Sequence, residues 1–142
     1  MKLKYYLAIS ILIATLFLSA CAPPTFIRTS HANWNTIELR DGLEYQEAWK
    51  IVVDTIGQKF DLDVVNQDGG YLRTGWDYKW TGAINESYRV RSLVKFAPDK
   101  RSLQVRSDAE YLGSNGWVMG EDERLTVTLK SDLMGKLGRI TK

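Results

Sequence analysis

The segment from Leu43 to Val64, LEYQEAWKIVVDTIGQKFDLDV, decides the fold class because its hydrophobic spacing changes partway along it. Up to Phe60 the apolar residues recur every three or four positions, which places them on one stripe of a helix. They are Tyr45, Ala48, Trp49, Val52, Ile56 and Phe60. From Phe60 onward, apolar and acidic residues alternate, which is typical of a strand. We therefore expect a helix over residues 43–60, capped by Asp41, that leads directly into a strand.

Three longer strands are predicted next, because alternating runs are separated by turn-forming residues at 66–70 and 97–100. The alternation in the first of them places Trp76 and Tyr78 on its apolar face, so we expect both rings to lie in the core. Short connections predict antiparallel neighbours with one covered and one wet face. The three runs are Tyr71–Trp80, Glu86–Phe96 and Ser102–Leu112.

The last part of the chain predicts a glycine-spaced loop over residues 113–120 and a second helix over residues 121–137. A strand at residues 124–129 is the alternative, because Leu125, Val127 and Leu129 also alternate. Residues 35–40 predict a short opening strand. The expected fold is α+β in the order β-α-β-β-β-β-α, with two helices on one face of a sheet of four to five antiparallel strands. We expect residues 35–142 to form a single domain.

Residues 1–20 have the form of an export signal, with a basic start and an apolar run from Tyr5 to Leu18 that is too short to be a typical membrane span. The following LSAC resembles the lipobox of bacterial lipoproteins, which implies cleavage before Cys21 and lipid attachment to its thiol. Cys21 is the chain's one cysteine and so has no internal disulfide partner. By the same resemblance, Ala22 after the cysteine implies the outer membrane, with the domain in the periplasm.

Residues 21–34 are expected to be the lipidated cysteine and a flexible tether, since they contain two prolines and small polar residues without periodicity. Such a tether would span roughly 20 Å on average and at most about 45 Å.

Charge and composition exclude two classes of protein. Of the 19 Lys and Arg residues, Lys2 and Lys4 precede Cys21, which leaves 17 basic against 17 acidic residues in the mature chain. A neutral chain lacks the basic footprint of nucleic-acid binding proteins, so we expect no nucleic-acid partner. With 44% hydrophobic residues the chain is also too apolar to be disordered.

Two patterns resemble a known family: the helix pattern YxxAWxxVxxxI from Tyr45 to Ile56, and GGYLRTGW from Gly69 to Trp76. Together, over residues 43–138, they resemble the helix-grip modules of BamC-type lipoproteins of the outer-membrane barrel assembly machinery. The resemblance implies helices across one face of an antiparallel sheet and non-catalytic binding of protein partners. This chain has one such module where those proteins have two.

The sequence offers little for catalysis. Nucleophilic triads and zinc sites need histidine, and His31 in the expected tether is the only one. The glycines of residues 113–120 do not form a phosphate-binding pattern. We therefore expect no catalytic residue, no metal and no small-molecule cofactor. A pair of carboxylates on the strands is the remaining hydrolytic alternative, and its candidates are Asp61, Asp63, Asp77, Asp108 and Glu110.

The candidate binding residues are arginines on the wet sheet face and two tryptophans. The arginines alternate with, or lie opposite, acidic residues, and are expected to pair with them across strands. They are Arg73, Arg89, Arg91 and Arg106. Trp80, near a strand end, and Trp117, in the glycine loop, are expected at the surface. The leading hypothesis is a non-catalytic binding or assembly-accessory module for another envelope protein. The alternative is a module that binds an envelope glycan or lipid.

Overall fold

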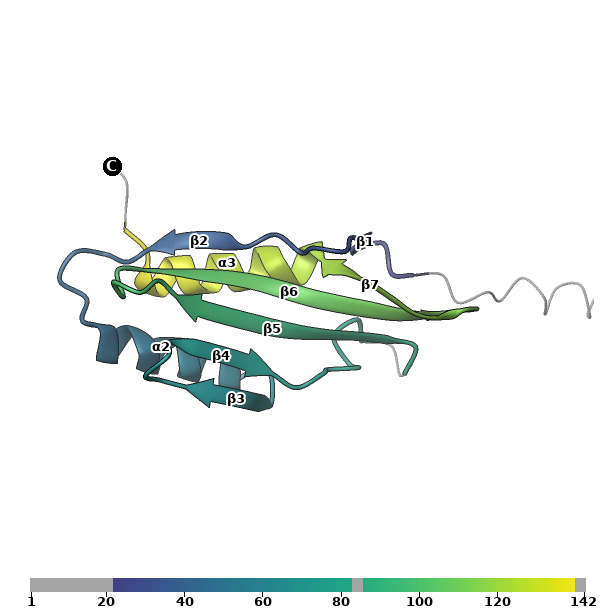
Figure 1. Ribbon diagram of the computed structural model, residues 1–142, viewed down its shortest axis with the longest axis horizontal. Helices are drawn as coiled ribbons and strands as arrows, with labels where there is room; N and C mark the ends of the chain where they lie inside the picture. Colours follow the sequence, from purple (N-terminus) through teal and green to yellow (C-terminus); the bar gives the residue numbers. More distant parts are fainter. Residues whose placement is uncertain (1–21, 83–85, 140–142) are drawn as a thin grey trace, which may run out of the picture.

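The computed structural model describes residues 22–82 and 86–139 as a seven-stranded antiparallel sheet with two helices (Figure 1). The expected signal at residues 1–20 and Cys21 lie outside the described residues. The elements are β1 (Phe26–Arg28), β2 (Asn35–Glu38), α2 (Tyr45–Gly57), β3 (Leu62–Asn66), β4 (Tyr71–Thr74), β5 (Tyr88–Phe96), β6 (Ser102–Gly113), β7 (Gly116–Asp122) and α3 (Glu123–Leu137).

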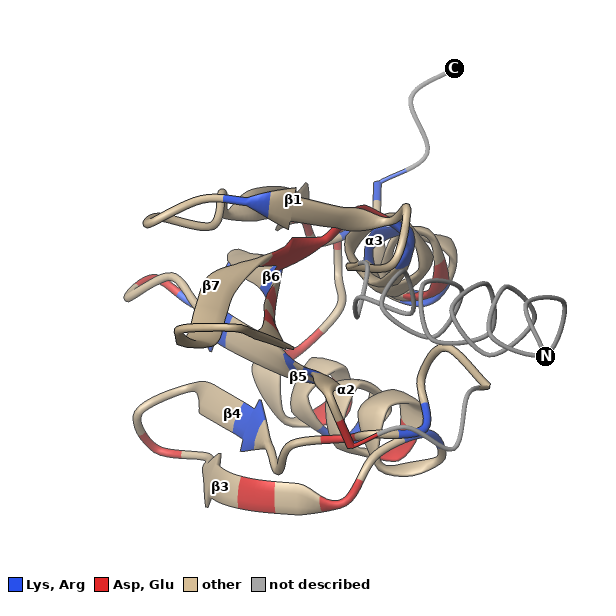
Figure 2. Cartoon of the chain, turned by 90° about the vertical axis from the view of Figure 1, so that its right-hand side faces the viewer, with Lys and Arg blue, Asp and Glu red and all other residues tan. Residues whose placement is uncertain are grey.

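Both helices lie on one face of the sheet, as expected, and leave the other face uncovered (Figure 2). The centre of the predicted stripe, Ala48, Trp49, Val52 and Ile56, is buried there in α2. Tyr45 is only partly buried, and Phe60 is buried beyond the end of the helix at Gly57. Four leucines of α3 lie in the same core: Leu125, Leu129, Leu133 and Leu137. The alternative of a strand at 124–129 is wrong, because those residues belong to α3. Within the described residues, neither helix is long and apolar enough to cross a membrane.

The start of α2 differs from the expectation. The helix begins at Tyr45 after Glu44, and no side-chain hydrogen bond caps its first turn. Asp41 does not act as the cap. Its carboxylate instead accepts a hydrogen bond of 2.7 Å from Arg139, beyond the end of α3. Asp41 therefore connects the segment before α2 to the segment after α3, and it does not cap either helix.

The sheet has the strand order β1-β7-β6-β5-β4-β3, and β2 pairs with the beginning of β6. It contains more strands than the expected four to five because two of them lie in segments that were expected to be irregular. β1 falls within the expected tether, and β7 occupies most of the expected loop at residues 113–120. The edge strands are short or irregular: β1 has three residues, and β3 carries a bulge at Asp63 between Leu62 and Val64.

A one-residue slip after β4 moves Trp76 and Tyr78 out of the core. In β4, Arg73 pairs with Leu93, so a continuous ladder would place residue 76 opposite Val90. The bridge actually joins Asp77 to Val90. The segment from Arg73 to Asp77 therefore contains one residue more than the matching segment of β5. Such a one-residue slip directs every following side chain to the opposite face of the sheet. Both rings therefore lie half-buried on the uncovered face, and their expected place in the core is wrong.

The β6–β7 hairpin turns at Ser114 and Asn115, with Gly113 opposite Gly116. Gly116 has φ +107°, a backbone conformation that other residues rarely adopt, so glycine is required there. Residues 111–120 contain no charged side chain. The hairpin projects beyond the rest of the sheet at one end of the molecule (Figure 1).

A buried carboxylate joins the base of this hairpin to the rest of the fold. Asp122 is fully buried at the end of β7, where it caps α3 through the backbone N–H of Leu125 at 2.7 Å. Its second oxygen accepts hydrogen bonds from the Tyr88 hydroxyl at 2.6 Å and the Thr25 hydroxyl at 2.8 Å. The backbone of Asp122 bonds to the Ser107 hydroxyl. Strands β5, β6 and β7, helix α3 and the residue before β1 all meet at this group.

The expected tether is therefore part of the folded domain from Thr25 onward. The Thr25 carbonyl accepts a hydrogen bond from the backbone of Glu123, and the Phe26 ring packs edge-on against Tyr88 and Tyr111. Strand β1 approaches β7 closely at Gly120, where an added Cβ would collide with the Ile27 carbonyl oxygen. Only residues 22–24 separate Cys21 from the first of these anchoring contacts, at Thr25, rather than the thirteen residues of the expected tether.

Tyr88 should make stability sensitive to alkaline pH. Burial of its hydroxyl, together with the hydrogen bond to Asp122, raises its pKa well above the ordinary value of 10.0. The unfolded chain ionises this phenol near pH 10 while the folded protein keeps it protonated. The contribution of Tyr88 to stability is therefore fully present below pH 10 and is lost as the pH rises above it. We expect this one group to lower the free energy of unfolding by up to about 1.4 kcal/mol per pH unit in that range.

The variant Tyr88→Phe tests this effect. Removal of the hydroxyl should lower stability by about 1–3 kcal/mol near neutral pH, because the Asp122 carboxylate loses a buried donor. It should also make the decline above pH 10 shallower. Urea unfolding at a series of pH values measures both quantities, and identical slopes for the two proteins would contradict the assignment.

Candidate functional site

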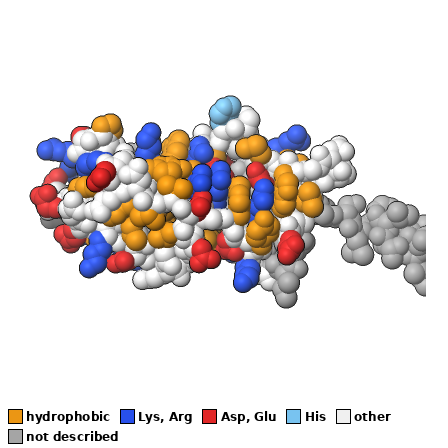
Figure 3. All heavy atoms as spheres, turned by 60° about the horizontal axis from the view of Figure 1, so that its bottom comes forward, with side chains coloured by type: hydrophobic (Ala, Val, Ile, Leu, Met, Phe, Trp, Pro, Cys, Tyr) orange, Lys and Arg blue, Asp and Glu red, His pale blue; other side chains and the backbone are white. Residues whose placement is uncertain are grey.

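The uncovered face of the sheet carries a cluster of arginine and tryptophan side chains. In Figure 3 basic side chains gather near the middle of the molecule, with hydrophobic side chains on both sides of them. Alternation along β5 and β6 directs these side chains away from the helices, since the intervening residues Val90, Ser92, Val105 and Ser107 are buried. We define the arginine–tryptophan cluster as Arg89, Arg91, Arg106, Trp34, Trp76 and Trp117.

Arginines and rings alternate in this cluster. The Arg89 guanidinium carbon lies 4.1 Å from the centre of the Trp117 ring and 4.6 Å from that of Trp76. Trp76 also contacts Arg91, at 4.5 Å. Arg106 covers Trp34 at 4.7 Å. These distances are those of cation–π contacts, so each ring is held in place by a charged neighbour.

Carboxylates of β6 orient the three arginines. Arg89 donates to one oxygen of Glu110 at 2.8 and 2.5 Å and to the Tyr78 hydroxyl at 3.1 Å. Arg91 donates to Asp108 at 2.9 Å. The other Asp108 oxygen lies 3.2 Å from Arg106. The expected cross-strand pairing is therefore confirmed for Arg89 with Glu110 and for Arg91 with Asp108, whereas Arg106 contacts Asp108 along its own strand.

The charges of this group do not cancel, because Asp108 serves two arginines. Arg89, Arg91 and Arg106 carry three positive charges, and Asp108 and Glu110 supply two negative ones. Burial alone would lower the pKa of Arg89, but its hydrogen bonds to Tyr78 and Glu110 outweigh that effect and raise it. Arg89 thus stays charged, and the formal charges of these five side chains leave one excess positive charge near Asp108 that could meet an anionic group.

A cavity of about 260 Å³ lies beside this excess charge. Its walls come from the segment Thr29–Ala32 and from Trp76, Arg91, Arg106 and Asp108. The segment that carries His31 was expected to belong to the tether, but it forms one wall of this cavity. The His31 ring bonds to its neighbour Ser30 at 2.9 Å.

Two expected binding residues lie apart from the cluster. Arg73 pairs with Asp63 on the bulged edge strand, at 2.5 Å. Its pKa is raised chiefly by that hydrogen bond. Trp80 packs against Phe60 at the rim of the core and beneath Arg124, with centroid distances of 5.9 and 4.9 Å. Its expected surface position is therefore only partly correct, because the ring is half-buried.

The structure adds Trp34 and Trp76 to the site, and the sequence reasoning missed both. Trp34 lies in a segment without periodicity, which was expected to be a flexible tether. Trp76 fits the apolar face of an uninterrupted strand, so it was expected in the core. A signal for Trp76 was present in the neighbouring Gly75, which is a common position for a break in a strand.

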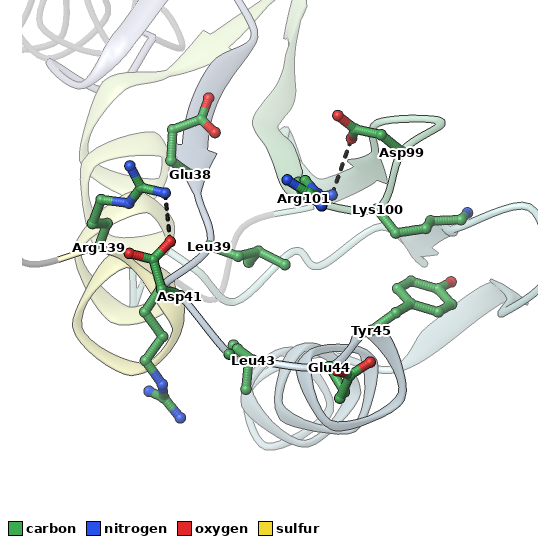
Figure 4. Close-up of a pocket in the computed structure, with 12 residues that line it drawn as sticks. Glu38, Leu39, Asp41, Leu43, Glu44, Tyr45, Asp99, Lys100, Arg101 and Arg139 are labelled. Atoms are coloured by element: carbon green, nitrogen blue, oxygen red, sulfur yellow. Dashed lines mark hydrogen bonds and ion pairs between the residues drawn. The ribbon is translucent and has the colours of Figure 1, made fainter.

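A second hollow, of about 600 Å³, lies at the opposite end of the molecule between β2, the start of α2 and the turn before β6 (Figure 4). Its charged residues connect neighbouring chain segments. Arg139 binds Asp41, and Arg40 donates to the Lys136 carbonyl at 2.5 Å. Lys100 lies 4.7 Å above the Tyr45 ring. These contacts indicate structural roles for Arg40, Asp41, Lys100 and Arg139.

Four of the five carboxylates considered for hydrolysis have other partners, and two of these, Asp63 and Glu110, bind Arg73 and Arg89. Asp108 binds arginines, and Asp77 accepts a hydrogen bond of 2.7 Å from the backbone of Lys79. Among residues 22–82 and 86–139, no three His, Cys, Asp or Glu side chains gather in a way that could hold a metal ion.

Replacement of Arg89 by lysine should test how much the stacked arrangement contributes. Lysine keeps the charge but loses the planar group that binds Glu110 and contacts two rings. We expect Arg89→Lys to lower the free energy of unfolding by about 1–2 kcal/mol. The matched control Arg73→Lys changes a solvent-screened pair at the sheet edge and should lower stability much less. Equal effects in urea unfolding would show that the cluster adds no stability of its own.

Comparisons with known proteins give no family assignment. No protein-family model matches this sequence, and no curated protein is significantly similar to it. The resemblance to BamC-type modules therefore rests on the helix pattern of residues 45–56 and on the segment Gly69–Trp76.

Proposed function

We propose that this protein is a lipid-anchored envelope lipoprotein of the bacterial outer membrane whose periplasmic domain binds another envelope protein without catalysing a reaction. The observation that carries the proposal is the arginine–tryptophan cluster on a sheet face that neither helix covers. The lipoprotein signal pattern before Cys21 supports the location.

The cluster has the chemistry of a protein-binding surface. Tryptophan and arginine are the residues that most often dominate binding energy at protein interfaces. Here the ion pairs to Asp108 and Glu110 already hold the arginines in place, so a partner pays little entropy to order them. The excess positive charge favours a partner that presents a carboxylate-rich surface.

We further propose that the fold is of the helix-grip type and that the protein is a single-module relative of BamC-type lipoproteins, an accessory to outer-membrane protein assembly. Two helices across one face of an antiparallel sheet support this assignment. The segment Gly69–Trp76 that carries the resemblance ends in a cluster residue, Trp76, which links the pattern to the proposed site.

The first test concerns the anchor. Protein extracted from the membranes of its own bacterial host should lack residues 1–20 and carry acyl chains on Cys21. Intact-mass analysis measures both features. A Cys21→Ser variant, which keeps the folded domain unchanged, should lose the lipid mass and leave the membrane fraction. An unmodified precursor in the soluble fraction would contradict the anchor.

The second test identifies what the cluster binds. A photoreactive amino acid placed at Lys95, an exposed position on the same sheet face, should capture a recurrent envelope protein in intact cells. The matched control at Lys130, exposed on α3, should not capture it. Capture should also be lost in the variant Arg91→Glu, because the charge that meets an acidic partner is reversed.

Other outcomes separate the alternatives. The cavity beside Arg91 and Arg106 favours a glycan or lipid with an anionic group as the second candidate ligand. Sugar or lipid adducts at Lys95 without protein would support that candidate and overturn the leading one. Turnover of peptidoglycan that is abolished by Asp77→Asn or Asp108→Asn would overturn both.

A further inference from the structure

Four exposed hydrophobic side chains gather at the hairpin end of the uncovered face. We define the hairpin patch as Ile27, Leu112, Trp117 and Met119, whose exposed fractions are 42%, 42%, 38% and 60%. Leu112 lies directly opposite Trp117 in the ladder, and Met119 is diagonal to Ile27 across β7 and β1. All four therefore belong to one surface rather than to scattered positions.

Charge is distributed unevenly between the two ends of the molecule. Residues 111–120, which form the outer part of the hairpin, contain no charged side chain, and an acidic residue beside them, Glu86, lines a hollow with Leu112 and Trp117. The opposite end holds the hollow of Figure 4, whose rim includes Asp41, Asp99, Lys100, Arg101 and Arg139. The hairpin end thus suits a partly apolar environment, and the end with the hollow of Figure 4 suits water.

The chain reaches its expected lipid from the same end. In Figure 1 the described chain begins on the side toward which the β6–β7 hairpin projects. Thr25 is bonded to Asp122 and Glu123 at the base of the hairpin. The four-residue connection from Cys21 to Thr25 spans at most about 14 Å. The seven residues of β7 extend roughly 20 Å from that base toward the hairpin tip.

We propose that the hairpin patch lies in the interfacial layer of the bilayer that holds the lipid on Cys21, as a second membrane contact. This inference rests on the proposed lipid anchor. A bilayer within about 14 Å of Thr25 is within reach of a hairpin that projects roughly 20 Å in the same direction. Tryptophan favours the membrane–water interface, and the adjacent apolar side chains favour the region just below the headgroups.

This arrangement also sets the orientation of the domain. With the hairpin at the bilayer and the anchor beside it, the long strands run away from the membrane. The plane of the sheet is then roughly perpendicular to the membrane plane, so that the uncovered face is turned neither toward the bilayer nor away from it. Trp117 belongs both to the patch and to the cluster, since its ring contacts Arg89. The cluster therefore begins at the membrane surface and extends away from it.

A bilayer quenching experiment on the full lipidated protein tests the proposal. Cys21 is the only native cysteine and is blocked when acylated, so an introduced cysteine can be labelled selectively with an environment-sensitive fluorophore. The test position is Met119→Cys in the patch. The matched control is Val127→Cys on α3, which is 61% exposed, nearly the same as Met119. The vesicles consist of phosphatidylethanolamine and phosphatidylglycerol with doxyl-labelled lipid as the quencher.

We expect the probe at position 119 to lose most of its fluorescence and to shift to shorter wavelength, while the probe at position 127 changes little. Intact-mass analysis of the same samples first establishes whether Cys21 is acylated. Acylated protein whose probe at 119 stays unquenched overturns the hairpin contact and leaves the anchor intact. Equal quenching at both positions overturns the orientation. Unacylated Cys21 overturns the anchor and this inference with it.

A second measurement separates a bilayer from a protein as the occupant. In isolated outer membranes, the cysteine at 119 should be protected from a water-soluble maleimide, and the same protection should be present in protein-free vesicles. Protection in membranes but not in vesicles would assign the patch to a protein partner and overturn the proposal.

Discussion

The fold depends on one buried charge, the carboxylate of Asp122. An isolated carboxylate is costly to bury, and this one is accommodated because a backbone N–H and two hydroxyl groups donate to it. The hydrogen bonds come from parts of the chain far apart in sequence: the start of α3, strand β5 and the residue before β1. The same group therefore begins a helix, holds the base of the hairpin and fixes the amino-terminal segment to the sheet.

This anchoring gives the uncovered face its shape. Because the segment after Thr25 is held against β7, residues 29–34 run beside the sheet and bring Trp34 onto Arg106. The slip after β4 brings Trp76 to the same face from the other side. Two irregular segments thus supply Trp34 and Trp76, strand β7 supplies Trp117, and strands β5 and β6 supply the arginines. A face that would otherwise be a row of paired charges becomes a surface with aromatic groups at defined positions.

Most of the regular structure could be predicted from periodicity. The stripe of α2 and the alternation of β5 and β6 are strong local patterns, and the structure buries the residues that they indicate. The arginines were predictable for the same reason, since alternation determines which face a side chain joins. Strand β7 was missed because its glycines are typical of a loop, although they lie in a hairpin whose partner strand, β6, was predicted correctly.

The remaining errors come from interactions that no local pattern contains. The role of Thr25 depends on a carboxylate 97 residues away, and three residues of β1 are too few to show alternation. The place of Trp76 depends on a single inserted residue, which reverses all faces that follow. Two of the three rings in the candidate site, Trp34 and Trp76, were therefore assigned elsewhere, while the arginines that contact them were assigned to the correct sheet face.

The two edges of the sheet matter wherever copies of the protein meet at high local concentration. Unpaired strand edges can template pairing between molecules. On one side of the sheet, β1 offers only three residues for such pairing and β2, which pairs only with β6, offers four. On the other side, the bulge at Asp63 interrupts the hydrogen-bonding row of β3. Neither edge is a long, regular template. The sheet can thus expose a whole face to partners while its edges resist growth into polymers.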